Sequence, residues 1–226
     1  PELFPDRRTD PVAFLATWGS HPRWLLERWL MRLAFSDVQA LVEHDNRRPH
    51  TFLVSLDLDV RQTLEHLGRV GIDADPTGEN PTCVRLAFGS APAAALSAVP
   101  ASIIQDPAAG LVARYADFPA GTDIADLCAA PGGKAMVLAG RARRLVAADL
   151  SMPRLRLVRE NAARTGRSVQ CVVADALHPP LASMDGVLLD APCSGTGTLA
   201  RHPDARWRLS PDDIGRFALL QERMLN

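Results

Sequence analysis

The chain has 226 residues, 47% of them hydrophobic and 23% charged, with a formal net charge of −1. This composition is typical of a globular protein with a core, and no run of about eighteen apolar residues argues for a membrane span. The near-neutral charge does not indicate nucleic-acid binding by bulk electrostatics. The four cysteines form no CxxC pair and the six histidines lack metal-ligand spacing. We therefore predict reduced thiols in a cytoplasmic protein, with no metal and no membrane anchor.

The first hundred residues combine helices with short strands. Ser20-His21-Pro22, followed by apolar residues at helical spacing, predicts a capped helix. After it we expect a helix over 36–44, a strand over 51–58, a helix over 60–70 and a strand over 84–88. The Ala/Pro-rich stretch 89–100 is the best candidate for a boundary. We therefore predict a small α/β module over 1–96 and a second domain over 97–226.

The second half alternates strands with helices. The predicted strands are 123–128, 145–149, 169–174 and 186–190, and the predicted helices are 134–140, 153–165 and 210–225. Such alternation with short connections predicts a parallel, doubly wound α/β sheet. Ligands of these sheets bind beyond the carboxyl ends of the strands, where the unusual residues of this chain occur.

The first of these strands runs into DLCAAPGGK, from Asp126 to Lys134. Two glycines at a strand-to-helix turn let backbone amides approach a ligand closely. The loop lacks the G-x-G-x-x-G of dinucleotide sites, and Cys128 and Ala135 exclude a phosphate-binding P-loop. The alternative is a tight turn without a ligand. Lys134 is the only lysine among many arginines, which indicates a site that requires a compact point charge.

Acidic residues follow the next two strands. Asp149 ends the second strand, where it could accept hydrogen bonds from ribose hydroxyls, and Asp175 follows the third, within reach of an adenine amino group. Together with the missing phosphate fingerprint, these residues predict an adenosine-bearing ligand without a pyrophosphate.

The fourth strand runs into DAPCSGTGTLARHPDARW, which places Asp190 and Cys193 on one rigid turn. Carbon-5 of cytosine accepts a methyl group only after a thiolate has added at carbon-6 and an acid has paired with the N3 and amino edge. Asp190 could be that acid, and Cys193 could take part in the thiol chemistry. The alternative is that Cys193 is a buried small apolar residue.

Arginines are concentrated between residues 141 and 167, a pattern that favours a solvated helix face over a binding patch. A smaller basic group with Trp207 follows the Asp190–Cys193 turn.

These motifs together closely resemble the Sun/Fmu-type RNA cytosine-C5 methyltransferases, and the bacterial enzymes acting on small-subunit ribosomal RNA look nearest. The resemblance is carried by DLCAAPGGK, AADLS, VADAL and LLDAPCSGTGTLARHPDARW, with weaker matches in SHPRWLLERWL and IQDPAAGL. It implies an incomplete Rossmann-like domain that binds S-adenosylmethionine, preceded by a module that contacts RNA, in a protein expected to be monomeric.

The resemblance also implies roles for individual residues. Asp149 would contact the cofactor's ribose, Asp175 its adenine, and Asp190 would lie between cofactor and base. Cys193 would assist release of the methylated product, while the nucleophile would lie in a later Thr-Cys-Ser segment. The remaining cofactor contacts implied are Cys128, Ala129, Ala130, Pro131, Gly132, Gly133 and Lys134. The RNA contacts predicted are Arg201, His202, Arg206 and Trp207.

The chain also departs from the family's pattern. It begins without an initiator methionine and ends at Asn226, so we expect an N-terminal piece, the Thr-Cys-Ser segment and the last three strands of the sheet to be missing. Ala135 replaces the usual Thr, and 54–57 lacks the usual Arg-Val-Asn. Two other hypotheses are a methyltransferase that attacks with Cys193, as the Pro-Cys motif of DNA enzymes does, and a non-catalytic RNA-binding or assembly protein.

Overall fold

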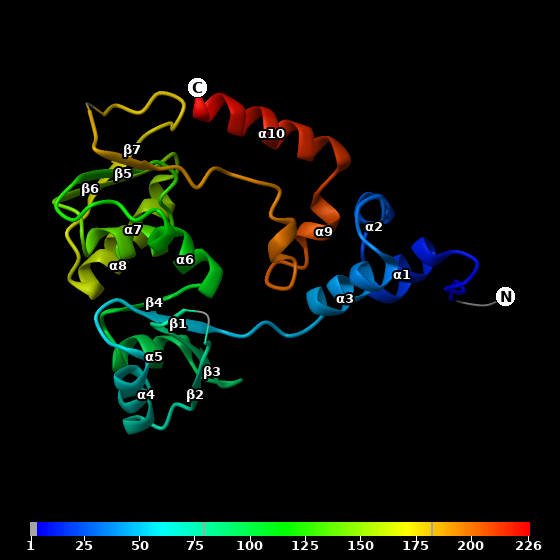
Figure 1. The fold of residues 1–226 in the computed structure, drawn as a ribbon, viewed down its shortest axis with the longest axis horizontal. Coiled ribbons are helices and arrows are strands. Elements are labelled where there is room, and N and C mark those ends of the chain that lie inside the picture. The colour runs from blue at the N-terminus through cyan, green and yellow to red at the C-terminus, as the bar shows by residue number, and fades with distance from the viewer. Residues whose placement is uncertain (1–3, 79, 182) are drawn as a thin grey trace. The chain divides into compact units, whose positions relative to one another are not determined.

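The computed structural model describes residues 4–78, 80–181 and 183–226. It divides into two compact units (Figure 1). One, the helical unit, contains the chain up to Pro49 and then Pro192–Asn226, and the other, the sheet unit, contains His50–Ala191. This division does not follow the boundary expected near residue 96, because the two ends of the chain cluster together and the whole middle forms one unit.

The helical unit is built around three N-terminal helices. Its helices are α1 (Pro11–Gly19), α2 (Arg23–Leu30), α3 (Phe35–Asp45), the 3₁₀ helix η1 (Thr196–Thr198), α9 (Ala205–Arg208) and α10 (Pro211–Leu225). Leu15, Leu26, Val38 and Val42 form the core between the first three. Helices α2, α3 and α10 confirm the predicted helices, but α2 begins after Pro22 without a side-chain cap, so the predicted cap is not formed. Helix α1 was not predicted, because its apolar residues occupy several faces and form no clear stripe.

An antiparallel sheet opens the sheet unit. It comprises β1 (Phe52–Ser55), β2 (Ala74–Pro76), β3 (Cys83–Leu86) and β4 (Ser102–Ile104) in the order β2-β3-β1-β4. Helices α4 (Val60–Arg69) and α5 (Pro92–Ala98) supply Leu67 and Ala95 to its core. Most of the stretch 89–100 is helical: its alanines, which favour helix, form α5 with a proline in the first turn.

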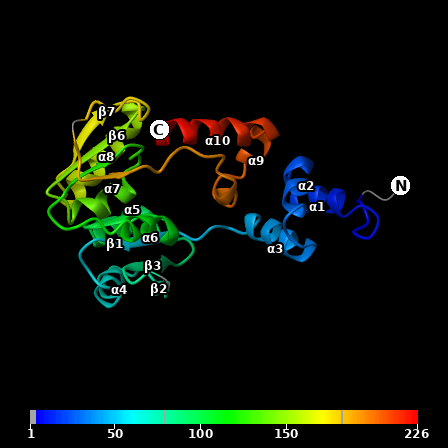
Figure 2. The same cartoon turned by 45° about the horizontal axis from the view of Figure 1, so that its top comes forward.

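The second sheet is parallel, as predicted. Its strands β5 (Asp123–Asp126), β6 (Arg144–Asp149), β7 (Gln170–Val173) and β8 (Gly186–Leu188) lie in the order β7-β6-β5-β8. Helices α7 (Gly133–Ala139) and α8 (Met152–Thr165) pack against it, and α6 (Pro107–Tyr115) packs against α7 (Figure 2). The strand order reverses direction at β5, between β6 and β8. The carboxyl ends of β5 and β8 therefore border the crevice where such sheets bind ligands.

No helix in the described residues is both long and apolar enough to cross a membrane.

Candidate active site

A pocket of about 360 Å³ opens at the carboxyl ends of β5 and β8. This volume is within the range of small-molecule sites. The pocket lies wholly in the sheet unit and mixes apolar walls with a few charged and amide groups. Its polar lining comprises Gln105, Asp126, Cys128, Lys134, Asn161, Arg164 and Asp190, together with the loop residues Ala129, Ala130, Pro131 and Gly133.

The glycine loop after β5 forms one wall of this pocket. Gly132 has φ +106°, and a Cβ atom there would come within 3.2 Å of the Val158 Cα atom. Glycine is needed at this position both for its backbone conformation and for the close approach to α8. At Gly133 a Cβ would lie 2.6 Å from the Gln105 amide nitrogen, so this glycine leaves room for a side chain from the antiparallel sheet.

Asp126 is the most deeply buried acid of the pocket, with only 1% of the residue exposed. Neither of its carboxyl oxygens accepts a well-formed hydrogen bond. Burial raises the pKa of Asp126 to about 7, and the nearby Cys128 amide and Lys134 only partly oppose this effect. A buried carboxyl without a partner, in a pocket wall, would be stabilised in its charged form by a cationic ligand.

Lys134 and Asp190 form an ion pair across the pocket. The ammonium nitrogen donates to Asp190 Oδ2 at 2.5 Å, with the lysine side chain 17% exposed and the aspartate 52% exposed. The pair joins the first turn of α7 to the turn after β8. The lone lysine that the sequence singled out thus holds the acid proposed for base recognition.

Asp149 and Asp175 lie at the carboxyl ends of β6 and β7, outside the residues that line the pocket. Asp149 is buried and accepts hydrogen bonds from the Ala130 amide at 3.2 Å and the Ser151 amide at 2.9 Å. Asp175 accepts from the Leu177 amide at 2.9 Å. Leu150, directly after Asp149, is 71% exposed and offers an apolar surface at the end of β6.

The remaining predicted site residues belong to the helical unit. Cys193 has an exposed thiol, and Arg201, His202 and Trp207 are exposed. Arg206 is only 4% exposed, and its guanidinium donates to the Asp45 carbonyl at 2.5 Å, to Asn46 Oδ1 at 2.7 Å and to two further carbonyls of the turn after α1.

The burial of Arg206 does not favour the prediction that it contacts RNA. Its two terminal guanidinium nitrogens donate to main-chain and side-chain acceptors near α1 and α3, so it anchors the segment after Cys193 to the N-terminal helices. The sequence placed it in an exposed basic group because nothing local indicates that this turn packs against residues 160 positions earlier.

Sequence reasoning missed three pocket residues, Gln105, Asn161 and Arg164. Gln105 precedes α6 in the segment IQDPAAGL, which was noted only for its resemblance. Arg164 was grouped with the arginine-rich stretch interpreted as a solvated helix face, and Asn161 was not singled out. No signal in the sequence distinguished these two residues from the other polar residues of the helix.

Three features of the sheet unit are shared with a known class of fold. They are the order of the parallel strands, the glycine loop after β5 and the acids after β6 and β7. A solved structure titled as a methyltransferase homolog from Pyrococcus horikoshii matches with a TM-score of 0.77 at 24% identity, covering 96% of this chain and 72% of that one. The chain has the Rossmann-like fold of S-adenosylmethionine-dependent methyltransferases.

The chain is also similar in sequence to ribosomal RNA methyltransferases. Residues 117–226 match the family model described as 16S rRNA methyltransferase RsmB/F. A Mycobacterium tuberculosis protein provisionally named as a methyltransferase is 34% identical over 100% of this chain and 50% of its own length. Ribosomal RNA small subunit methyltransferase B of Klebsiella pneumoniae is 36% identical over 91% of this chain and 50% of its own length. The predicted resemblance to this family is confirmed, and the chain spans about half the length of the curated relatives it matches.

Proposed function

We propose that this chain forms the S-adenosylmethionine-binding part of an enzyme that methylates carbon-5 of a cytosine in ribosomal RNA. The observation that carries the proposal is the convergence of the CAAPGGK loop, Asp126 and the Lys134–Asp190 pair on one pocket. The similarity to small-subunit ribosomal RNA methyltransferases supports the choice of substrate.

The charges of the pocket fit this cofactor. S-adenosylmethionine carries an ammonium, a sulfonium and a carboxylate, and the lining offers Asp126 and Asp190 for cations and Lys134 for an anion. Asp149 and Asp175, beside the exposed Leu150, would meet the ribose and the adenine. No group of three or more metal-binding side chains occurs in the described part of the chain, and the proposal requires none.

The chain's own residues would act on the base as follows. The bound cofactor supplies the methyl group. Asp190, held by Lys134, would pair with the N3 and amino edge of cytosine and so favour addition of a thiolate at carbon-6. After methylation, loss of the proton from carbon-5 returns its electron pair to the ring and expels the thiolate. Cys193, whose thiol is exposed, would assist this last step.

A second assignment makes Cys193 the attacking thiolate. Its exposure and its position directly after Pro192 favour this hypothesis. RNA containing 5-fluorocytosine distinguishes the two in the full-length protein, because fluorine at carbon-5 prevents elimination and traps the adduct. An adduct that survives Cys193→Ala excludes Cys193 as the nucleophile, and an adduct lost in that variant supports it.

Exposed residues of the helical unit extend the proposal to RNA contact. Trp207, 65% exposed, offers a ring on which an unpaired base can stack, and Arg201 and His202 precede it on the same surface segment. We place the protein in the cytoplasm, where its proposed substrate is found. We propose that it acts as a monomer.

Calorimetric titration of the chain with S-adenosylmethionine tests the cofactor assignment. We expect saturable binding that is lost in Asp149→Ala and retained in Asp75→Ala, a control with an exposed carboxylate in the same unit. No binding by a chain that melts cooperatively would contradict the assignment.

A further inference from the structure

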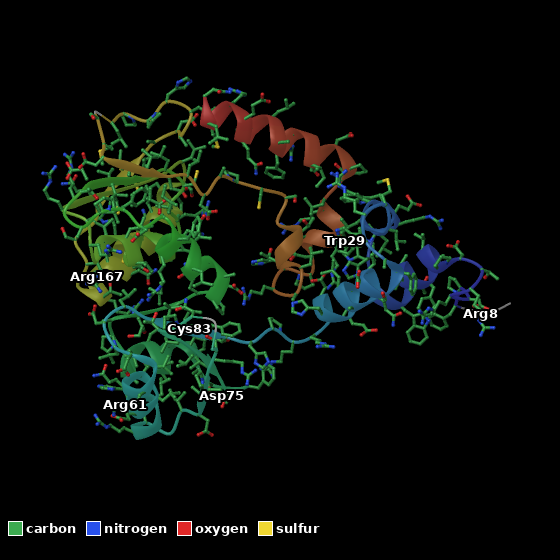
Figure 3. The ribbon with its side chains drawn as sticks, viewed as in Figure 1. Arg8, Trp29, Arg61, Asp75, Cys83 and Arg167 are labelled. Atoms are coloured by element: carbon green, nitrogen blue, oxygen red, sulfur yellow. The ribbon has the colours of Figure 1, made fainter. Side chains whose placement is uncertain are left out.

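Helix α8 contacts three distant segments of the sheet unit through polar side chains. Arg154, in its first turn, donates to the Ala130 carbonyl at 2.6 Å. Arg167, just after its end and labelled in Figure 3, pairs with Asp57. Arg156 and Arg159 are exposed. The arginines in and just after this helix are therefore not only a solvated face: Arg154 binds a loop carbonyl and Arg167 pairs with an acid.

Asn161 makes the contact that concerns the pocket most directly. Its amide nitrogen donates to the Pro131 carbonyl at 3.0 Å, and its amide oxygen accepts from the Arg164 guanidinium at 2.8 Å. A carbonyl can only accept and a guanidinium can only donate, so these partners define the orientation of the amide. Asn161 thus links the glycine loop to Arg164.

Arg164 continues this link to the antiparallel sheet. It donates to the Pro100 carbonyl at 2.8 Å and to the Ser102 carbonyl at 2.6 Å, at the start of β4. Strand β4 leads directly into Gln105, which lies against Gly133 on the pocket wall. The two walls of the pocket, the glycine loop and the end of β4, are therefore joined through two side chains of one helix.

We propose that Asn161 and Arg164 are positioning residues. Their hydrogen bonds hold the glycine loop at a set distance from β4 and so determine the affinity for the cofactor. The proposal rests on the proposed function in taking S-adenosylmethionine as the ligand of the pocket. Without these hydrogen bonds the glycine loop would have to become ordered when the ligand binds, and the lost conformational entropy would weaken binding.

Asn161→Asp separates this role from a general loss of structure. The carboxylate keeps the contact with Arg164 but places an acceptor against the Pro131 carbonyl, so only the link to the loop is broken. We expect about tenfold weaker S-adenosylmethionine binding by calorimetry, the size expected for one lost hydrogen bond. In the ligand-free chain, amides of residues 128–134 should exchange hydrogen faster, while those of β6 are unchanged.

Arg156→Ala, an exposed change on the same helix, is the matched control and should leave both measurements unchanged. If Asn161→Asp does not melt cooperatively, Asn161→Ala, which adds no charge, replaces it with the same expected results. Wild-type affinity in the variant, unchanged exchange in the loop, or faster exchange throughout the unit would each overturn the proposal. Failure of the wild-type chain to bind S-adenosylmethionine would instead refute the proposed function, and the exchange measurement would still decide whether Asn161 orders the loop.

Discussion

Ionisation of Asp126 should make the stability of the sheet unit depend on pH. The folded-state pKa of this carboxyl is about 7 because of burial, whereas its ordinary value is 3.8. The proton is therefore bound more tightly in the folded protein than in the unfolded chain. The stabilising contribution of the neutral carboxyl is fully present below about pH 4 and is lost as the pH rises through about 7.

The difference between the two pKa values gives the size of the effect. It corresponds to about 4 kcal/mol of unfolding free energy between pH 4 and pH 8, as an upper limit, because relaxation of the surroundings reduces it. Asp126→Asn keeps the shape of the neutral acid and cannot ionise. The advantage of the variant over wild type should therefore be about 2 to 3 kcal/mol larger at pH 8 than at pH 5.

Urea unfolding followed by far-UV circular dichroism at several pH values measures this difference. All four tryptophans lie in the helical unit, so their fluorescence should not respond to the substitution and serves as an internal control. Asp75→Asn, an exposed acid in the sheet unit, should show no such dependence. A stability difference between Asp126→Asn and wild type that stays constant from pH 5 to pH 8 would refute the reasoning.

Three further outcomes are expected. Arg206→Ala should lower the unfolding free energy of the helical unit by about 3 kcal/mol, because it leaves several buried acceptors unpaired. The exposed Arg208→Ala should lower it by less than about 1 kcal/mol. Urea unfolding followed by tryptophan fluorescence compares the two variants. Gly132→Ala should cost about 1 to 3 kcal/mol by circular dichroism, and wild-type stability would show that the positive φ is not required. At pH 8, iodoacetamide should alkylate the exposed Cys193 well before Cys128, because burial raises the pKa of Cys128 to about 11. Mass spectrometry after partial labelling measures the order, and equal labelling of both thiols would contradict the prediction.

The parallel sheet could be predicted closely because its signals are local. Buried strands such as β6 are continuous apolar runs that end at an acid, and α8 has a serine cap and a glycine after its last turn. The short elements of the antiparallel sheet could not be predicted in the same way. Strands β2 and β4 have three residues each, too few to display alternation, and they form because β3 and β1 are available to pair with them.

Pocket residues could be picked out where the sequence is unusual, and they were missed where a residue acts through a distant partner. The glycine loop, Lys134 and Asp190 stand out in the sequence, and the structure brings them to one pocket. Asn161 and Arg164 look like ordinary residues of a polar helix. Their partners are main-chain carbonyls 30 to 64 positions away, and a carbonyl leaves no trace in the sequence.

The same argument explains why arginine-rich segments of this chain were hard to interpret. Arg206 and Arg164 are each surrounded by carbonyl oxygens at turns and strand ends, where helix and sheet hydrogen bonding leaves acceptors unused. A guanidinium offers five donors in a plane and can satisfy several such acceptors at once, which an ammonium on a flexible chain does less well. A protein that uses arginine for nearly all of its positive charge can therefore use the same residue type for hydrogen bonds between distant segments and for binding RNA. Arg206 is an anchor in this structure because such carbonyls surround it, and contact of the exposed Arg201 with RNA stays a prediction.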